Sequence, residues 1–213
     1  MTTVTRIAKP VLYAGARITY SWTLATVPRR EDLPALLNRR HLLGTAVEVG
    51  VQSGAFSETL LDTWRGQKLI SVDPWTAAED YDDVSNVPQD AQDELHRSTC
   101  RRLARFDDRS DVWRMTGHDA SVRIADSSLD FVYLDARHDY ESVCEDLADW
   151  WPKLKPGGLF SGHDYVDGKL ATGDYGVKRA VDEFLAKRNL QPRKTLLETT
   201  SASWLVIKQQ PPT

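Results

Sequence analysis

The chain has 213 residues, of which 41% are hydrophobic and 27% are charged, with a formal net charge of −4. This length suits one domain with a packed core, and the composition excludes wholesale disorder. The acidic balance lacks the basic footprint of nucleic-acid binding, so we expect no nucleic-acid partner. No apolar run is long enough to span a membrane, and no signal peptide is evident. Two cysteines, Cys100 and Cys144, fit a reducing compartment, which predicts a cytoplasmic protein.

The first forty residues differ in pattern from the rest. They contain "RREDLPALLNRR", which has the spacing of a short amphipathic helix. We therefore expect residues 1–43 to form a helical N-terminal extension that serves as a lid or as the contact of a homodimer. Residues 44–213 are expected to form the main domain.

Short apolar runs alternate with helical patterns along this main domain. The expected strands are 45–51, 68–73, 111–117, 129–135, 157–164, 193–200 and 203–208, and the expected helices are 55–65, 91–106, 141–154 and 176–188. Apolar strands alternating with helices indicate a parallel sheet with both faces covered. The last two strands are too close in sequence for a parallel crossover. The predicted fold is α/β: a Rossmann-like, doubly wound, mostly parallel seven-stranded sheet with an antiparallel C-terminal hairpin and helices on both faces.

Two loops at the open end of this sheet have compositions that bear on function. Residues 75–90 are acidic, aromatic and unpatterned, which suits a lid over a site and equally a solvated insertion. Residues 167–176, "DGKLATGDYG", are expected to be a second flexible loop whose glycines permit opening and closing.

A glycine-containing turn follows the first strand in "VEVGVQSGAFSETLL". Gly50 and Gly54 allow a sharp turn that brings backbone N–H groups close to a ligand. Glu48 lies inside the strand, where a carboxylate needs a partner, either a ligand amine or the N–H groups of the turn. Asp73 ends the second strand and is placed to accept hydrogen bonds from both hydroxyls of a ribose. The alternative role of Asp73 is to cap the following turn.

Acidic and histidine residues follow the fourth and fifth strands. Asp135 and Asp164 end these strands, so both should reach the same mouth of the sheet. Two carboxylates that converge repel each other unless a cation lies between them or one is protonated, and Mg²⁺ is the simplest such cation. His163 is placed to be a further ligand or to support one, and His138 is placed to take a proton.

From about Gly44 to Leu185 the chain resembles the class I S-adenosylmethionine-dependent methyltransferases, which makes residues 44–213 the methyltransferase domain. The resemblance implies that the turn holds the methionine part of the cofactor, that Asp73 holds its ribose, and that the adenine lies near the residues after the third strand. The cofactor-binding residues that it implies are Glu48, Gly50, Ser53, Gly54, Ser57, Asp73, Trp75, Gly117, His118, Asp119 and Asp135.

The stretch "LDARHDYESVCEDLADWWPKLKPGGLFSGHDY", followed by "GVKRAVDEFL", resembles the signature of metal-dependent sugar O-methyltransferases such as macrocin O-methyltransferase. The resemblance implies that Asp135 and Asp164 bind a divalent metal, that Asp135 and His138 are catalytic, and that His138 is the general base. His163 stands where that group has another aspartate, and we include it among the metal ligands.

The expected activity is transfer of a methyl group to a hydroxyl of a mono- or oligosaccharide, and the resemblance suggests a mannose- or glucose-based acceptor. Acceptor contacts are expected from Tyr81, His138, Tyr165 and Tyr175, with Trp75 on the same loop as Tyr81. The alternatives are a catechol-type phenol O-methyltransferase, a nicotinamide-dependent oxidoreductase and a non-catalytic nucleotide-binding module. The absence of G-x-G-x-x-G counts against the oxidoreductase.

Overall fold

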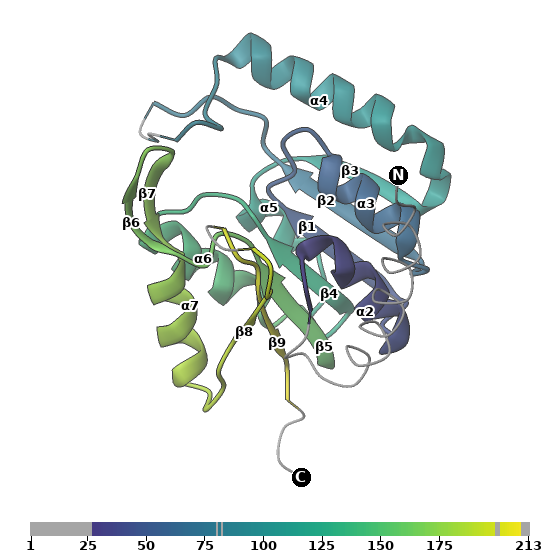
Figure 1. Ribbon diagram of the computed structural model, residues 1–213. Coiled ribbons are helices and arrows are strands. Elements are labelled where there is room, and N and C mark those ends of the chain that lie inside the picture. Colours follow the sequence, from purple (N-terminus) through teal and green to yellow (C-terminus); the bar gives the residue numbers. More distant parts are fainter. Residues whose placement is uncertain (1–26, 80, 82, 199–200, 210–213) are drawn as a thin grey trace, which may run out of the picture.

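A seven-stranded sheet organises the chain in the computed structural model (Figure 1), which describes residues 27–79, 81, 83–198 and 201–209. Its order is β3-β2-β1-β4-β5-β9-β8. The first five strands along the chain pair in parallel, and β9 and β8 complete the sheet in antiparallel fashion. The strands are β1 (Thr45–Val49), β2 (Lys68–Asp73), β3 (Ser110–Arg114), β4 (Leu129–Leu134), β5 (Leu154–Gly162), β8 (Arg193–Lys194) and β9 (Trp204–Ile207). The predicted fold is confirmed.

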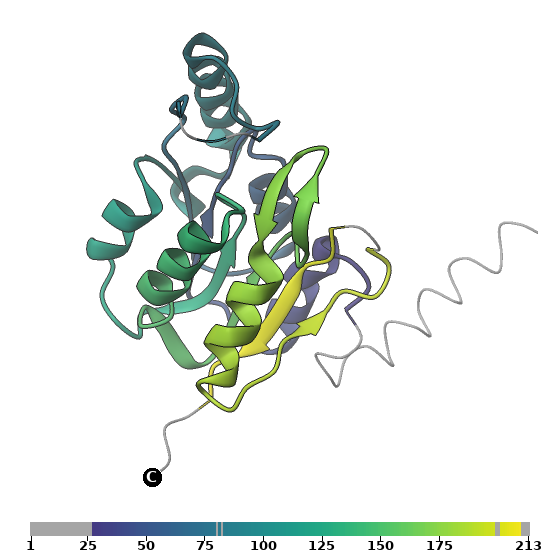
Figure 2. The ribbon, with the colours of Figure 1, turned by 90° about the vertical axis from the view of Figure 1, so that its left-hand side faces the viewer.

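Helices cover both faces of this sheet because successive strand residues point to opposite sides. In β1, Val47 joins the core beneath one set of helices and Ala46 joins the core beneath the other. The Val47 side is covered by α5 (Gly117–Val122), α6 (Tyr140–Trp150) and α7 (Val177–Ala186). The Ala46 side is covered by α2 (Leu33–Arg39) and α3 (Ala55–Thr63). Figure 2 shows α6 and α7 together on one side of the sheet.

The helix α4 (Gln89–Leu103) lies along the outer edge of the molecule (Figure 1), and the 3-10 helix η3 (Ala104–Arg109) leads from it into β3. A second 3-10 helix, η2 (Arg30–Asp32), precedes α2. The predicted helix in "RREDLPALLNRR" is therefore present, and its Leu33 and Leu37 are fully buried in the core on the α2 side. Residues 1–26 of the expected extension lie outside the described residues, and its role as a lid or dimer contact stays a prediction.

Three local expectations were wrong. Residues 167–176 contain an ordered antiparallel hairpin, β6 (Asp167–Leu170) and β7 (Gly173–Gly176), whose paired backbones satisfy the hydrogen bonds of this polar stretch. The strand expected at 193–200 pairs only over β8. The strand expected at 111–117 ends at Arg114, because Thr116 caps α5 by accepting a hydrogen bond from the backbone N–H of Asp119.

Among the described residues, the structure contains no helix with the length and apolar character needed to cross a membrane.

Candidate active site

A cavity of about 460 Å³ opens at the carboxyl ends of β1, β2 and β4. The strand order reverses here, since β2 lies on one side of β1 and β4 on the other, and such crevices are the usual ligand sites of open α/β sheets. The predicted site residues that line it are Gly50, Asp73, Tyr81, Gly117, His118 and Asp135. Segments distant in sequence therefore meet in one cavity.

Gly50 makes the close approach between the first turn and the end of β4. Its φ is +88°, and a Cβ atom at this position would lie 2.0 Å from the backbone oxygen of Asp135. Its N–H donates to the Val72 carbonyl at 2.9 Å, and the N–H of Asp135 donates to the Val49 carbonyl at 2.7 Å. Only glycine fits here without displacing the backbone that carries Asp135.

Asp73 faces the cavity and also holds the turn. Its Oδ2 accepts hydrogen bonds from the backbone N–H groups of Val51 and Gln52, both at 2.9 Å, and its Oδ1 accepts from the N–H of Trp75 at 2.7 Å. The capping role considered for Asp73 is thus present. An ionised carboxylate has about four acceptor positions, so the same group can still accept from a ligand hydroxyl.

Several predicted cofactor residues do not line the cavity. Glu48 is buried and accepts a short hydrogen bond from the Ser57 hydroxyl on α3, so its partner is neither of the two that the sequence suggested. Burial raises the pKa of Glu48 to about 8, against the opposing effect of that hydrogen bond. Trp75 is fully buried, and its indole N–H donates to the Gln52 carbonyl at 2.8 Å. The other predicted residues outside the cavity wall are Ser53, Gly54 and Asp119.

Helix α6 supplies a wall that the sequence did not suggest. Its residues Ser142, Asp146 and Asp149 line the cavity together with Gly117 and His118. Their spacing of three to four residues was the available signal, since it puts them on one polar face of the helix. His118 Nδ1 is 2.9 Å from Asp149, and this contact raises the pKa of the exposed imidazole. Burial and the charge of Asp149 raise the pKa of Asp146 to about 7.

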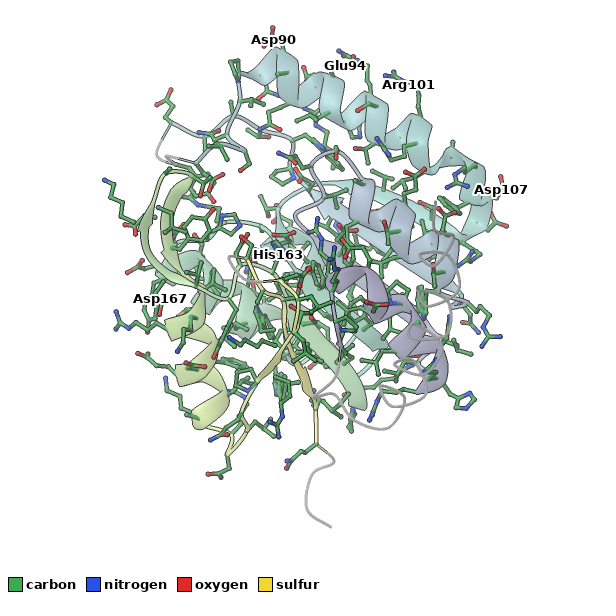
Figure 3. The ribbon with its side chains drawn as sticks, in the orientation of Figure 1. Asp90, Glu94, Arg101, Asp107, His163 and Asp167 are labelled. Carbon is green, nitrogen blue, oxygen red and sulfur yellow. The ribbon has the colours of Figure 1, made fainter. Side chains whose placement is uncertain are left out.

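Beside this cavity, Asp135, His138 and Asp164 offer ligand atoms that all lie within 4.8 Å of one another. His138 Nε2 is 3.3 Å from Asp164 Oδ2 and 3.8 Å from Asp135 Oδ1. His163 Nδ1 is 3.2 Å and 3.8 Å from the same two oxygens. Figure 3 shows His163 in the interior of the view, whereas Asp90 and Glu94 point outward from α4. The four residues predicted for metal binding and catalysis are thus neighbours.

The electrostatics of this group are those of carboxylates that need a cation. Burial opposes the charged form of His138, but the nearby carboxylates of Asp135 and Asp164 outweigh it and raise the pKa to about 11. Burial likewise opposes charge on His163, and the same carboxylates raise its pKa. Burial also opposes ionisation of Asp164, but its two histidine contacts lower its pKa well below the ordinary value. The imidazolium groups balance the carboxylates here.

The residues present fit a divalent ion. His138 Nε2 is buried and makes no hydrogen bond within the described part of the chain. It lies beside the carboxylate oxygens of Asp135 and Asp164. Carboxylate oxygens with an imidazole nitrogen are a donor set that divalent ions accept in proteins.

Arg30 reaches the same group from the segment before α2. Its guanidinium Nη1 is 3.3 Å from Asp135 Oδ2, and the guanidinium lies 5.2 Å from the ring centre of Phe56. Its backbone N–H donates to Glu198 at 3.1 Å. No sequence pattern indicated this contact, because it depends on how this segment docks beside the sheet.

The tyrosines predicted to meet the acceptor have different places. Tyr81 lines the cavity, and its hydroxyl is 3.2 Å from His138 Nδ1. Tyr175 stacks on the His138 ring with centroids 4.7 Å apart. The Tyr165 hydroxyl donates to Asp182 on α7, so Tyr165 is turned toward that helix.

Comparison with known proteins assigns the chain to a family. Residues 47–165 match the model of a family described as a methyltransferase domain. No curated protein matches the sequence.

Solved structures with a similar fold include three that cover most of the chain. An O-methyltransferase from Bacillus cereus, solved with S-adenosylhomocysteine, is 15% identical over 94% of this chain and 90% of its own, with a TM-score of 0.59. The O-methyltransferase TomG of tomaymycin synthesis from Streptomyces achromogenes, solved with S-adenosylmethionine, is 16% identical over 93% and 88%, with a TM-score of 0.60. A putative rRNA methylase from Clostridium thermocellum is 14% identical over 86% and 97%, with a TM-score of 0.62.

These structural likenesses show a shared fold, whereas the family match extends over more than half of the sequence. The matched residues begin within β1 and run past the end of β5, and they include Asp73, Asp135 and Asp164. The chain therefore belongs to the methyltransferase domain family, and the prediction that it is a methyltransferase is confirmed.

Proposed function

We propose that the protein transfers the methyl group of S-adenosylmethionine to an alcohol hydroxyl of a small, uncharged acceptor such as a sugar. The observation that carries this proposal is the position of Asp135. Its side chain belongs to the Asp135–His138–Asp164 group, and the same residue lines the large cavity. A methyl donor in the cavity and an acceptor at that group would therefore meet beside one residue.

The cavity wall supports a cofactor that carries a positive sulfonium. The carboxylates that line it are those of Asp73, Asp135, Glu145, Asp146 and Asp149. Their negative potential favours a cation over a neutral molecule of the same shape. In the proposed arrangement Asp73 accepts from the ribose, the Gly50 turn faces the methionine part, and Gly117 and His118 lie against the adenine. Two of the similar structures were solved with S-adenosylmethionine or S-adenosylhomocysteine.

Asp135 and Asp164, with His163, are proposed to hold a divalent ion, and His138 is proposed as the general base. A divalent ion at these residues would lower the pKa of an acceptor hydroxyl, as it lowers that of bound water. Uncompensated, the carboxylates raise the pKa of His138 to about 11 and hold a proton on it. A base that accepts a proton near neutral pH needs that negative charge balanced, so the two proposed roles depend on each other.

The surroundings of His138 favour an alcohol as the acceptor. A phenol loses its proton more readily than a sugar hydroxyl and depends less on a base, whereas this histidine is 3.1 Å from a buried carboxylate, that of Asp83. Nucleic acid is disfavoured because the carboxylates of the cavity would repel a phosphate backbone. The similar putative rRNA methylase shares the fold with this chain.

The first test supplies methyl-labelled S-adenosylmethionine and a panel of mono- and disaccharides, catechol and an RNA oligonucleotide, with Mg²⁺ or with EDTA. Label that moves to a saccharide only with Mg²⁺ supports the proposal. Transfer that survives EDTA contradicts the metal, and transfer to catechol or RNA alone contradicts the acceptor class.

The assignment of His138 as base, as opposed to ligand, is tested by His138→Ala. As the base, its loss should abolish turnover while calorimetry shows Mg²⁺ binding retained. Loss of Mg²⁺ binding would instead make His138 a ligand.

A further inference from the structure

Two segments outside the main sheet meet next to His138. One is the described part of the loop between β2 and α4 (residues 74–79, 81 and 83–88), and the other is the β6–β7 hairpin. Figure 1 shows the two beside each other. Asp83 forms a β-bridge with Gly173, and the N–H of Val84 donates to the Thr172 carbonyl at 3.2 Å. The backbone therefore joins the loop to the hairpin, and the two form one cover, which we call the lid.

The lid contacts both the backbone and the ring of His138. The hydroxyl of Tyr81 accepts from the backbone N–H of His138 at 3.1 Å, and the N–H of Gly176 donates to its carbonyl at 2.8 Å. Tyr175 stacks on the ring with an interplanar angle of 13°. Asp83 Oδ2 is 3.1 Å from Nδ1. The Nε2 atom alone is left to face the acidic group.

Asp83 is built into the lid as a fixed acceptor. Its side chain is only 3% exposed, although it comes from a loop. Its Oδ1 accepts from the backbone N–H and the hydroxyl of Ser85, at 2.8 Å and 2.6 Å, which fixes the carboxylate. Its Oδ2 is thereby aimed at His138. A carboxylate accepts hydrogen bonds only, so the Nδ1 atom that faces it carries a proton.

We propose that Asp83 is a positioning residue, which holds a proton of His138 on Nδ1 and so leaves Nε2, beside Asp135 and Asp164, as the nitrogen that takes the acceptor's proton when the lid is docked. A histidine ring is set by the partner of its other nitrogen, and such partners matter about 10- to 100-fold in related sites. This inference rests on the proposed function of His138. It adds that the reactive nitrogen is selected by a residue of the lid, so docking of the lid completes the site.

The test compares Asp83→Asn with Asp174→Asn, a matched change at an exposed residue of the β6–β7 hairpin, the other part of the lid. Asparagine offers an amide N–H₂ to Nδ1, which favours the opposite tautomer with the proton on Nε2. In ¹⁵N-histidine-labelled protein with Mg²⁺ and S-adenosylhomocysteine, the His138 signals should show protonated Nδ1 in the wild type and in Asp174→Asn. They should show protonated Nε2 in Asp83→Asn, and the His138→Gln spectrum assigns the signals.

The kinetic expectation for Asp83→Asn is a kcat about 10- to 100-fold lower. The affinity for S-adenosylhomocysteine and the melting temperature should match those of Asp174→Asn. The same tautomer in Asp83→Asn and in the wild type, or kcat within twofold of the wild type, would overturn the proposal. If Asp83→Asn lowers the melting temperature, Asp83→Ser replaces it, since the shorter serine side chain takes the carboxylate acceptor away from Nδ1. The spectra test the role of Asp83 even if no tested acceptor is methylated. The lack of methylation would count only against the proposed function.

Discussion

Replacing Glu48 by glutamine should stabilise the protein increasingly as the pH rises. Glu48 is 2% exposed, and burial raises its pKa to about 8 from an ordinary value of 4.5. Between these two values the unfolded chain has released the proton while the folded chain keeps it. The free energy of unfolding therefore falls with rising pH in this window and is fully retained below about 4.5. The glutamine side chain does not titrate, so Glu48→Gln lacks this contribution to the pH dependence.

The size of this effect follows from the shift in pKa. One pH unit between the two pKa values costs about 1.4 kcal/mol, and the residue is partly titrated at both ends of the range, so the wild type should lose about 3.5 kcal/mol between about pH 5 and pH 8 through this residue. Urea unfolding of the wild type and Glu48→Gln at both pH values measures this loss. It is the change, between the two pH values, in the difference between their free energies of unfolding. The exposed Glu79→Gln serves as control. A difference between wild type and Glu48→Gln that is the same at both pH values would refute the reasoning, because Glu48 would then be ionised in the fold.

Three further outcomes are expected around the cavity. Gly50→Ala should lower the free energy of unfolding by about 2–4 kcal/mol, since its Cβ would meet the Asp135 carbonyl at a positive φ; an unchanged melting temperature would oppose this. Asp73→Ala should weaken S-adenosylhomocysteine binding by about 1.5–3 kcal/mol in calorimetry, and unchanged affinity would mean that the ribose is held elsewhere. Arg30→Met should strengthen Mg²⁺ binding by about threefold to tenfold, because the guanidinium competes for Asp135; weaker binding would argue that Arg30 supports the site.

The sheet was predictable because its strands are short, nearly continuous apolar runs, and the strand ends at Asp73, Asp135 and Asp164 followed from them. Contacts that depend on tertiary packing were missed, because the spacing of residues along the chain does not indicate them. Arg30 reaches Asp135 from more than a hundred residues away, and the contact exists only once η2 docks. The sequence does show acidic residues three to four apart on α6, but the same spacing occurs on any solvent-exposed helix face.

The hairpin of the lid could not be predicted for a different reason. "DGKLATGDYG" has the glycine and polar content of a loop, and the pairing of Asp167 with Gly176 is a property of the folded backbone. Tyr165 and Trp75 were expected at the acceptor because they lie close in sequence to site residues. In the structure the Tyr165 hydroxyl donates to Asp182 and the Trp75 indole N–H donates to the Gln52 carbonyl, so both polar groups have partners that sequence proximity did not indicate.

The placement of β9 has a consequence for how the chain is made. β5 pairs with β4 on one side and with β9 on the other, although β9 is separated from it by the hairpin, α7 and β8. While the ribosome is still synthesising residues 163–203, the free edge of β5 presents unpaired backbone groups next to an apolar face. Such an edge is a template for pairing with other chains. Pairing of Trp204–Ile207 with β5 covers this edge once these residues have left the ribosome. Slow synthesis of residues 163–203 should therefore increase the need for chaperones.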